Sequence, residues 1–203
     1  SRQSRGLGDV YKRQALDSYE RGAKVIAVND LGGAVFNKDG LNIPELFKHI
    51  AKTPSVKGFE GGEDYEGEIL EIECDVLIPA AVGGVITSSN AEKIKTNVLI
   101  EGANSPTTLN ADKILRENGV IIIPDILANA GGITASYFEW VQNTQNYLWK
   151  ETELHEKLID VMLTSFEEVW TISQKQNCDL RTAALIKGIK RVAAAKLTRG
   201  LFP

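Results

Sequence analysis

The feature that most constrains the fold of this chain is the alternation of short apolar runs with helical segments. Four runs are predominantly apolar, and they cover residues 24–29, 74–78, 97–100 and 120–123. Such runs are typical of strands that are buried on both faces of a parallel sheet, and the helical segments between them supply the crossovers that parallel strands need. The sequence therefore predicts an α/β fold with a parallel sheet and flanking helices.

Capping residues and apolar spacing locate the helices. Asn42 stands ahead of a proline and a glutamate, and Ser89 lies three residues before Glu92, which is the spacing of a capping box. Between the apolar runs we predict helices over 43–51, 89–95 and 107–117. After the last run the pattern is entirely helical and predicts a carboxyl-terminal helical segment, with helices over 132–149, 151–174 and 180–197.

Charge and composition exclude several classes of function. The 203 residues carry a net charge of −4, which disfavours nucleic acid as a partner. The longest apolar stretch, 76–86, is too short to span a bilayer, and we expect no membrane partner and no signal peptide. Cys74 and Cys178 are far apart and form no metal-binding or disulfide pattern, which favours a reduced cytoplasmic protein without a metal site.

Ligands of open parallel sheets bind at the carboxyl ends of the strands, so the segments that follow the runs are the candidate site. Segments 79–84, 101–108 and 124–136 each place small residues directly after a strand, where a flat ligand can approach the backbone. Asp30 ends the first run, and its carboxylate could accept hydrogen bonds from a ribose hydroxyl. The alternative is that Asp30 belongs to an ordinary turn.

The segment 129–136 (NAGGITAS) carries the clearest binding signal. Asn129, Gly131 and Gly132 open a helix whose N–H groups and positive dipole end suit a carboxylate, and Ser136 lies one turn further on. A helix start that serves only packing is the alternative. Glu101, directly after the third run, is either a functional carboxylate or, with more weight, a solvated or helix-capping one.

Several stretches together resemble the carboxyl-terminal half of the hexameric glutamate dehydrogenases. They are VIAVND, CDVLIPAA, EGANSPTT, PDILANAGGITASYFEWVQN and the tail that begins at DLRTAALIKG, and the match runs from about Ala15 to Pro203. EGANSPTT and SYFEWVQN are similar to the glutamate enzymes rather than to the leucine, valine and phenylalanine dehydrogenases. The resemblance implies a Rossmann-like NAD(P)-binding domain over 15–203 that includes the carboxyl-terminal helices.

The same resemblance implies oxidative deamination of L-glutamate to 2-oxoglutarate and ammonia, with NAD or NADP as the hydride acceptor, in a homo-hexamer. It also implies roles for eight residues. These are Asp30 at the adenine ribose; Ala80, Ala81 and Asn104 in the cofactor cleft; Asn129 near the nicotinamide; and Gly132, Ile133 and Ser136 beside the substrate, with Ser136 toward its side-chain carboxylate.

The chain departs from the family pattern in three respects: one segment after a strand, the absence of a catalytic domain, and the start of the chain. Val82, Gly83 and Gly84 follow the Pro-Ala-Ala element, where the family usually has Leu-Glu-Asn, and any polar contact from that stretch is lost. The family's catalytic lysine and aspartate lie in a separate amino-terminal domain that has no counterpart here. We therefore expect a fragment that carries no catalytic residue and whose partner is the missing amino-terminal domain.

The third departure is the start of the chain. Gly6 and Gly8 align with the first two glycines of the dinucleotide fingerprint G-x-G-x-x-G, but Tyr11 replaces the third. The preceding SRQSR is polar where a doubly buried strand should be, and the first fourteen residues hold four basic residues against one acidic. We expect residues 1–14 to be a non-native or degenerate start. The alternative is a working phosphate loop in which Gly6 and Gly8 contact the cofactor.

Two other functions remain open on the sequence. A related dehydrogenase that acts on branched-chain or aromatic amino acids would have an apolar group where Ser136 meets the substrate. A non-catalytic nucleotide-binding module would bind the cofactor without ever having had a catalytic domain.

Overall fold

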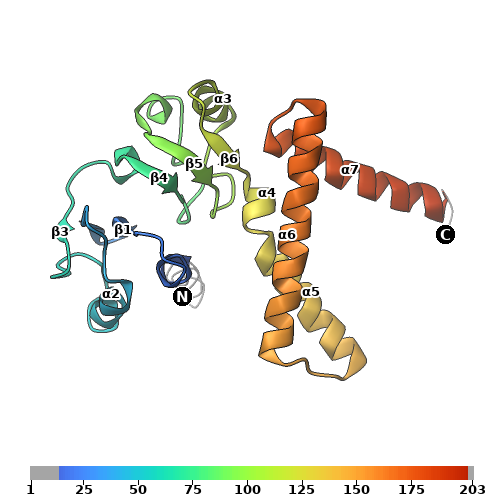
Figure 1. Cartoon of the computed structure of the whole chain (residues 1–203), viewed down its shortest axis with the longest axis horizontal. Coiled ribbons are helices and arrows are strands. Elements are labelled where there is room, and N and C mark those ends of the chain that lie inside the picture. The colour runs from blue at the N-terminus through green and yellow to red at the C-terminus, as the bar shows by residue number, and fades with distance from the viewer. Residues whose placement is uncertain (1–13, 201–203) are drawn as a thin grey trace. The chain divides into compact units, whose positions relative to one another are not determined.

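The computed structural model describes residues 14–200, and the chain divides into two compact units, Ser1–Glu73 and Cys74–Pro203. Figure 1 shows an α/β chain whose second unit ends in three long helices. Gly6 and Gly8 lie outside the described residues, as does all of the expected non-native start except residue 14.

The first unit is an antiparallel sheet with one main helix, preceded by a helix over residues 14–20. Its elements are β1 (Ala27–Asp30), β2 (Gly33–Phe36), α2 (Ile43–Ile50) and β3 (Glu63–Asp64). The strands lie in the order β1-β2-β3, and Val28 pairs with Val35. The core of this unit consists of Val35, Leu41, Ile43, Leu46, Val56 and Phe59.

The start of α2 follows from its sequence. The Asn42 side chain accepts a hydrogen bond from the backbone N–H of Glu45 at 3.1 Å, and Pro44 occupies the first turn. Ile43 and Leu46, one turn apart, are buried in the core. The helix that the capping pattern predicts over 43–51 is thus confirmed to within one residue.

The second unit begins with a parallel sheet and continues into helices. Its main elements are β4 (Cys74–Leu77), β5 (Thr96–Ile100), α3 (Leu109–Glu117), β6 (Ile121–Ile123), α4 (Asp125–Ala128), α5 (Ala130–Gln145), α6 (Glu151–Gln176) and α7 (Leu180–Arg199). The strands lie in the order β4-β5-β6, and Val98 pairs with Val76 on one side and Ile121 on the other. All three parallel strands lie at the predicted positions.

The helices of this unit have their own apolar core. The central helix α6 packs against α5 and α7 (Figure 1). The core consists of Leu127, Val169, Leu180 and Ala183, and Phe166 and Ile172 pack against it. The alignment of these residues on α6 agrees with the helical spacing in the sequence.

The run 24–29 differs from the prediction. Its strand β1 pairs antiparallel with β2 in a hairpin, and the parallel sheet contains only β4, β5 and β6 among the described strands. The hairpin forms because Gly32 and Gly33 make a tight turn possible, and the φ of Gly33 is +153°. In a doubly wound sheet the first strand of the fingerprint lies between the second and fourth strands, and that segment lies outside the described residues.

Two helices also differ from the prediction. The helix predicted over 89–95 is a single 3₁₀ turn, Ala91–Lys93, because the Asn90 side chain accepts from the N–H of Thr87 and donates to the Val85 carbonyl, which closes a turn instead. The helix predicted over 132–149 begins at Ala130 and ends at Gln145, where Asn146 adopts a left-handed conformation with φ +50°.

Candidate functional site

The segments that follow β4, β5 and β6 are joined by backbone hydrogen bonds at the carboxyl ends of the strands. The N–H of Ala103 donates to the Pro79 carbonyl at 2.9 Å, and the N–H of Glu101 donates to the Ile123 carbonyl at 3.1 Å. The N–H of Gly84 donates to the Ser105 carbonyl at 2.9 Å. The three predicted site segments of this unit therefore form one continuous surface, which we call the carboxyl edge.

Two predicted cofactor residues meet on the carboxyl edge. The side-chain amide of Asn129 donates to the side-chain carbonyl oxygen of Asn104 at 2.8 Å. Asn104 is exposed and Asn129 is half-buried, so each amide keeps hydrogen-bonding capacity toward solvent. This amide pair brings together residues from the ends of β5 and α4 that are 25 positions apart in the sequence.

The loop after β4 approaches this pair closely. A Cβ on Gly83 would lie 2.8 Å from the backbone oxygen of Asn104, so no larger residue fits there without displacing the loop. Ala80 is half-buried and Ala81 is exposed on the same loop. Small side chains therefore lie next to the amide pair on this loop, apart from Val82, which is 60% exposed.

The three predicted substrate residues lie on the first turns of α5. Gly132, Ile133 and Ser136 are all exposed, and Ile133 keeps 74% of its surface accessible. Asn129 ends α4 and precedes α5, and its side chain makes no capping hydrogen bond because it binds Asn104 instead. Gly131 and Gly132 lie inside the first turn of α5, because the helix begins at Ala130, two residues before the predicted start at Gly132.

A buried charge cluster supports the carboxyl edge, and sequence reasoning missed it. Arg181 of α7 donates from Nη2 to Glu101 at 2.8 Å, from Nη1 to Asp125 at 3.1 Å and from Nε to Asp112 at 3.2 Å. Arg116 donates to the other oxygen of Asp112 at 2.6 Å. The only signal in the sequence is that a carboxylate directly after a buried strand needs a cationic partner.

Glu101 has a structural role that the sequence described only in part. Its side chain is completely buried, so the solvated alternative is wrong. One oxygen, Oε2, accepts from Arg181 and also from the N–H of Asp125, the first residue of α4, at 2.9 Å, which agrees with a helix-capping role. Its other oxygen, Oε1, has no hydrogen-bond partner among the described residues.

The cluster also affects the pKa of Arg181. Burial works to lower the pKa of Arg181, but the hydrogen bond and charge of Glu101, together with those of Asp112, outweigh it and raise the pKa above the usual value. Arg181 therefore stays cationic, and its guanidinium neutralises part of the surrounding carboxylate charge.

Asp30 lies in the other unit, where its carboxylate is bound by protein donors. Oδ1 accepts from the Gly32 N–H and the Ser55 hydroxyl, both at 2.8 Å, and Oδ2 accepts from the Val56 N–H at 2.8 Å. These bonds agree with the turn interpretation of Asp30. They use three of the roughly four acceptor positions of a carboxylate.

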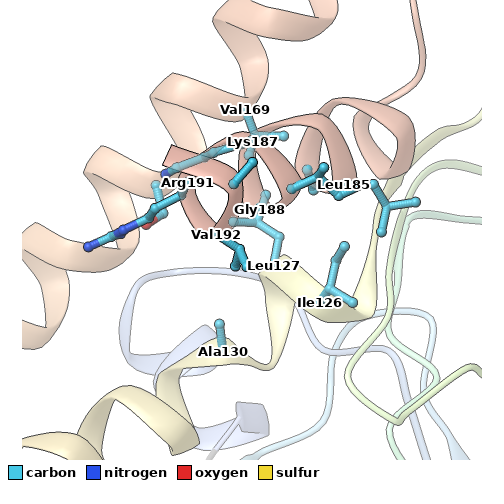
Figure 2. A pocket seen from close by; sticks show the side chains of 13 residues that line it. Ile126, Leu127, Ala130, Val169, Leu185, Lys187, Gly188, Arg191 and Val192 are labelled. Carbon is cyan, nitrogen blue, oxygen red and sulfur yellow. The ribbon is translucent and has the colours of Figure 1, made fainter. Parts of the chain in front are cut away.

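A separate apolar groove of about 680 Å³ lies between α4, α6 and α7. Figure 2 shows Leu127, Val169 and Val192 lining it, with Lys187 and Arg191 at the side of α7. None of the site residues predicted from the sequence lines this groove. Its lining offers few polar groups to orient a ligand, and the carboxyl edge is the better candidate site.

Within residues 14–200, no cluster of three or more His, Cys, Asp or Glu side chains could hold a metal ion. Over the same residues, no helix is both long enough and apolar enough to cross a membrane.

Comparison with known proteins gives matches along nearly the whole chain. A family model described as glutamate/leucine/phenylalanine/valine dehydrogenase matches residues 3–200. The chain is 44% identical over 200 residues to the glutamate dehydrogenase of Thermotoga maritima, which covers 98% of this chain and 48% of that protein. It is also 44% identical over 195 residues to the catabolic NAD-specific glutamate dehydrogenase of Bacillus subtilis, with 96% and 46% covered.

Solved structures agree with these matches. The glutamate dehydrogenase of Peptoniphilus asaccharolyticus superposes with a TM-score of 0.81 at 31% identity, over 97% of this chain and 46% of that chain. The hetero-hexameric glutamate dehydrogenase of Thermus thermophilus in its Leu-bound form superposes with a TM-score of 0.85 at 28% identity, over 93% and 45%. The chain thus spans about half the length of the curated relatives it matches.

Proposed function

Since the chain belongs to the glutamate/leucine/phenylalanine/valine dehydrogenase family, we propose that it is the NAD(P)-binding part of an enzyme that oxidatively deaminates L-glutamate to 2-oxoglutarate and ammonia. The observation that carries the proposal is the amide pair of Asn104 and Asn129 at the carboxyl ends of parallel strands. This is where open α/β sheets bind their ligands.

The carboxyl edge fits a dinucleotide. Small residues follow β4 beside the amide pair, since Ala80 and Ala81 are at least partly accessible and Gly83 lets its loop pack against the Asn104 backbone. Ala80, Ala81 and Asn104 would line the cofactor cleft, and Asn129 would bind near the nicotinamide. The bound cofactor supplies the hydride acceptor, and this chain supplies its position and orientation.

The exposed face at the start of α5 would bind the amino acid. Ser136 would donate a hydrogen bond to the side-chain carboxylate of glutamate, beside Gly132 and Ile133. The acid and base groups that activate the substrate would come from an amino-terminal domain, as the half-length match to the relatives suggests. We propose that the complete enzyme is a homo-hexamer. Because Cys74 and Cys178 are free thiols, we place it in the cytoplasm.

Calorimetric titration of the 203-residue chain with NADH tests the cofactor proposal. We expect saturable binding that Asn104→Ala weakens about 3- to 10-fold, the cost of one or two hydrogen bonds. Asn110→Ala, which removes an exposed amide from α3, is the matched control and should leave the affinity unchanged. Equal affinities for the parent chain and Asn104→Ala would contradict the assignment of the carboxyl edge.

The substrate proposal needs the chain joined to an amino-terminal catalytic domain. There, Ser136→Ala should raise the KM for glutamate by an amount worth about 1–2 kcal/mol, because a carboxylate loses one hydrogen bond. The KM for the cofactor should hardly change, and a parallel rise of both constants would assign Ser136 to the fold or to the cofactor instead. The isolated chain should not turn over glutamate at all.

A further inference from the structure

We propose that Arg181 is a positioning residue that holds the amide pair of Asn104 and Asn129 in place through Asp125 and Glu101. The consequence for cofactor binding rests on the proposed function, whereas the positioning of the two amides does not. Arg181 belongs to α7, and the sequence analysis assigned no residue of this helix to the candidate site.

The Arg181 guanidinium contacts three elements that end or begin at the carboxyl edge. It reaches Glu101, directly after β5, at 2.8 Å and Asp125, the first residue of α4, at 3.1 Å. Its third contact is Asp112 in α3, at 3.2 Å. The side chain of Arg181 is 22% exposed and that of Glu101 is completely buried, so water can replace little of this contact.

Asp125 links Arg181 to the backbone next to Asn104 and to the helix that precedes Asn129. Its Oδ2 accepts from the N–H of Ser105 at 2.8 Å, and Ser105 directly follows Asn104 with a φ of +47° that few residues adopt unless it is held. The backbone N–H of Asp125 donates to Glu101 at 2.9 Å, which fixes the start of α4. The helix α4 ends at Ala128, and Asn129 directly follows it as the capping residue.

Only an arginine can make these contacts at once. Its planar guanidinium presents five N–H groups in fixed directions, whereas a lysine offers one compact ammonium group. A lysine at position 181 would keep the positive charge but lose the simultaneous contacts to Glu101 and Asp125. Arg181→Lys therefore tests whether the geometry of the guanidinium contacts matters, because the positive charge at position 181 is unchanged.

Arg116 provides a matched control on the same cluster. It binds Asp112 from the other side at 2.6 Å and reaches Asp179 at 3.6 Å. Neither of these partners contacts the amide pair. Arg116→Lys makes the same replacement at the far end of the cluster, where the arginine side chain is 42% exposed, and so removes a guanidinium from Asp112 without touching Glu101 or Asp125.

The experiment measures the side-chain amide signals of Asn129 by ¹⁵N NMR in the full 203-residue chain. We expect Arg181→Lys to shift these signals and to speed their hydrogen exchange, and Arg116→Lys to leave them as in the parent chain. Asp125→Asn, which keeps the size of the side chain but replaces one acceptor oxygen with a donor, should reproduce the effect of Arg181→Lys. If Arg181→Lys does not fold, Asp125→Asn alone decides.

Unchanged Asn129 signals in the folded Arg181→Lys or Asp125→Asn chain would overturn the proposal. Equal changes in Arg181→Lys and Arg116→Lys would also overturn it, because the cluster would then act through stability alone. Titration with NADH adds a separate readout, in which Arg181→Lys should weaken binding at least 3-fold. If the parent chain fails to bind NADH while the Asn129 signals respond as expected, the proposed function fails and the positioning role stands.

Discussion

Asp30 shows how a single carboxylate can organise a turn. Three donors from Gly32, Ser55 and Val56 converge on it, so the end of β1 is tied to the segment that follows α2. Hydrogen bonds to a charged acceptor are stronger than those between neutral groups. The side chain therefore has a structural function whether or not it also accepts from a ribose.

Replacing Asp30 tests both roles. Asp30→Ser should lower the free energy of unfolding by about 1–3 kcal/mol, since Ser55 and Val56 lose their charged acceptor, and urea titration followed by circular dichroism measures this. Asp39→Ser, at an exposed acid of the same unit, should change stability by less than about 0.5 kcal/mol. In a complete enzyme, Asp30→Ser should weaken the binding of NAD more than that of NADP, because the carboxylate accepts a hydrogen bond from the 2′-hydroxyl of NAD and repels the 2′-phosphate of NADP. Equal loss for both would leave Asp30 with the structural role alone.

Asp179 makes the stability of α7 depend on pH. Burial tends to raise the pKa of this carboxyl, but hydrogen bonds from Thr182 and the charge of Arg116 outweigh burial and lower it. A lowered pKa in the folded state means that the carboxylate stabilises the fold above its unfolded pKa of about 4. That contribution disappears as the pH falls through the lower, folded pKa.

The matching substitution is Asp179→Asn. An asparagine still caps α7 by accepting from the N–H of Thr182, but it loses the charge that favours a helix start. We expect Asp179→Asn to cost about 0.5–1 kcal/mol at pH 7 and less at pH 3, as measured by urea titration at both values. A cost that stays constant with pH would show that the charge of Asp179 contributes nothing.

At the scale of elements, glycines at two places should respond to the same substitution with opposite signs. Gly188 lies inside α7, and a Cβ there would meet nothing within 4 Å. Gly188→Ala should raise stability by about 0.5–1 kcal/mol, because alanine loses less backbone entropy in a helix. Gly83→Ala should lower it by about 1–3 kcal/mol, because its Cβ would lie 2.8 Å from the Asn104 backbone oxygen. Thermal unfolding of both variants measures the two signs.

Local patterns predict the elements whose formation is local. The apolar runs at 74–78, 97–100 and 120–123 became β4, β5 and β6. Leu99 on the central strand is completely buried, whereas Val76 and Ile121 on the outer strands are 47% and 45% exposed, so the expectation of strands buried on both faces does not hold for β4 and β6. The helices over 43–51 and 107–117 follow from capping and apolar spacing, and both are confirmed within two residues. The meeting of Asn104 and Asn129 follows from the rule that strand ends share one edge.

Non-local partners explain what the sequence did not predict. Strand β2 was missed because its start, Gly32 and Gly33, is typical of a turn, and only pairing with β1 shows that the chain folds back. Arg181 and Glu101 are 80 positions apart, and no periodicity links them. A charge pair of this kind depends on how α7 packs beside the end of β5, which is a property of the tertiary fold.

At the scale of the whole molecule, each unit has an apolar core of its own. The core of the first unit lies between β2 and α2. The second unit buries apolar residues of β5 and α3, such as Leu99 and Leu115, and has a further cluster between α4, α6 and α7. We therefore expect a fragment of residues 74–203 to fold alone, with the Asn129 side-chain amide signals of the full chain. A fragment that shows collapsed, poorly dispersed NMR spectra would contradict this expectation.

The start of the chain permits an equally direct test. If residues 1–14 are a non-native start, a chain of residues 15–203 should keep the unfolding free energy and NADH affinity of the full chain. A working phosphate loop at Gly6 and Gly8 would instead make the shortened chain lose NADH affinity by at least tenfold, because the pyrophosphate loses its backbone donors.

The positions of the tryptophans determine which part of the molecule intrinsic fluorescence reports. All three tryptophans, Trp140, Trp149 and Trp170, belong to the second unit, on α5, just before α6 and on α6. The Trp149 ring packs edge-on against Phe138, and the Lys157 ammonium lies 5.1 Å from its centre. Intrinsic tryptophan emission therefore follows the helices and does not report the first unit directly. Unfolding of the first unit has to be followed through its tyrosines, Tyr11, Tyr19 and Tyr65.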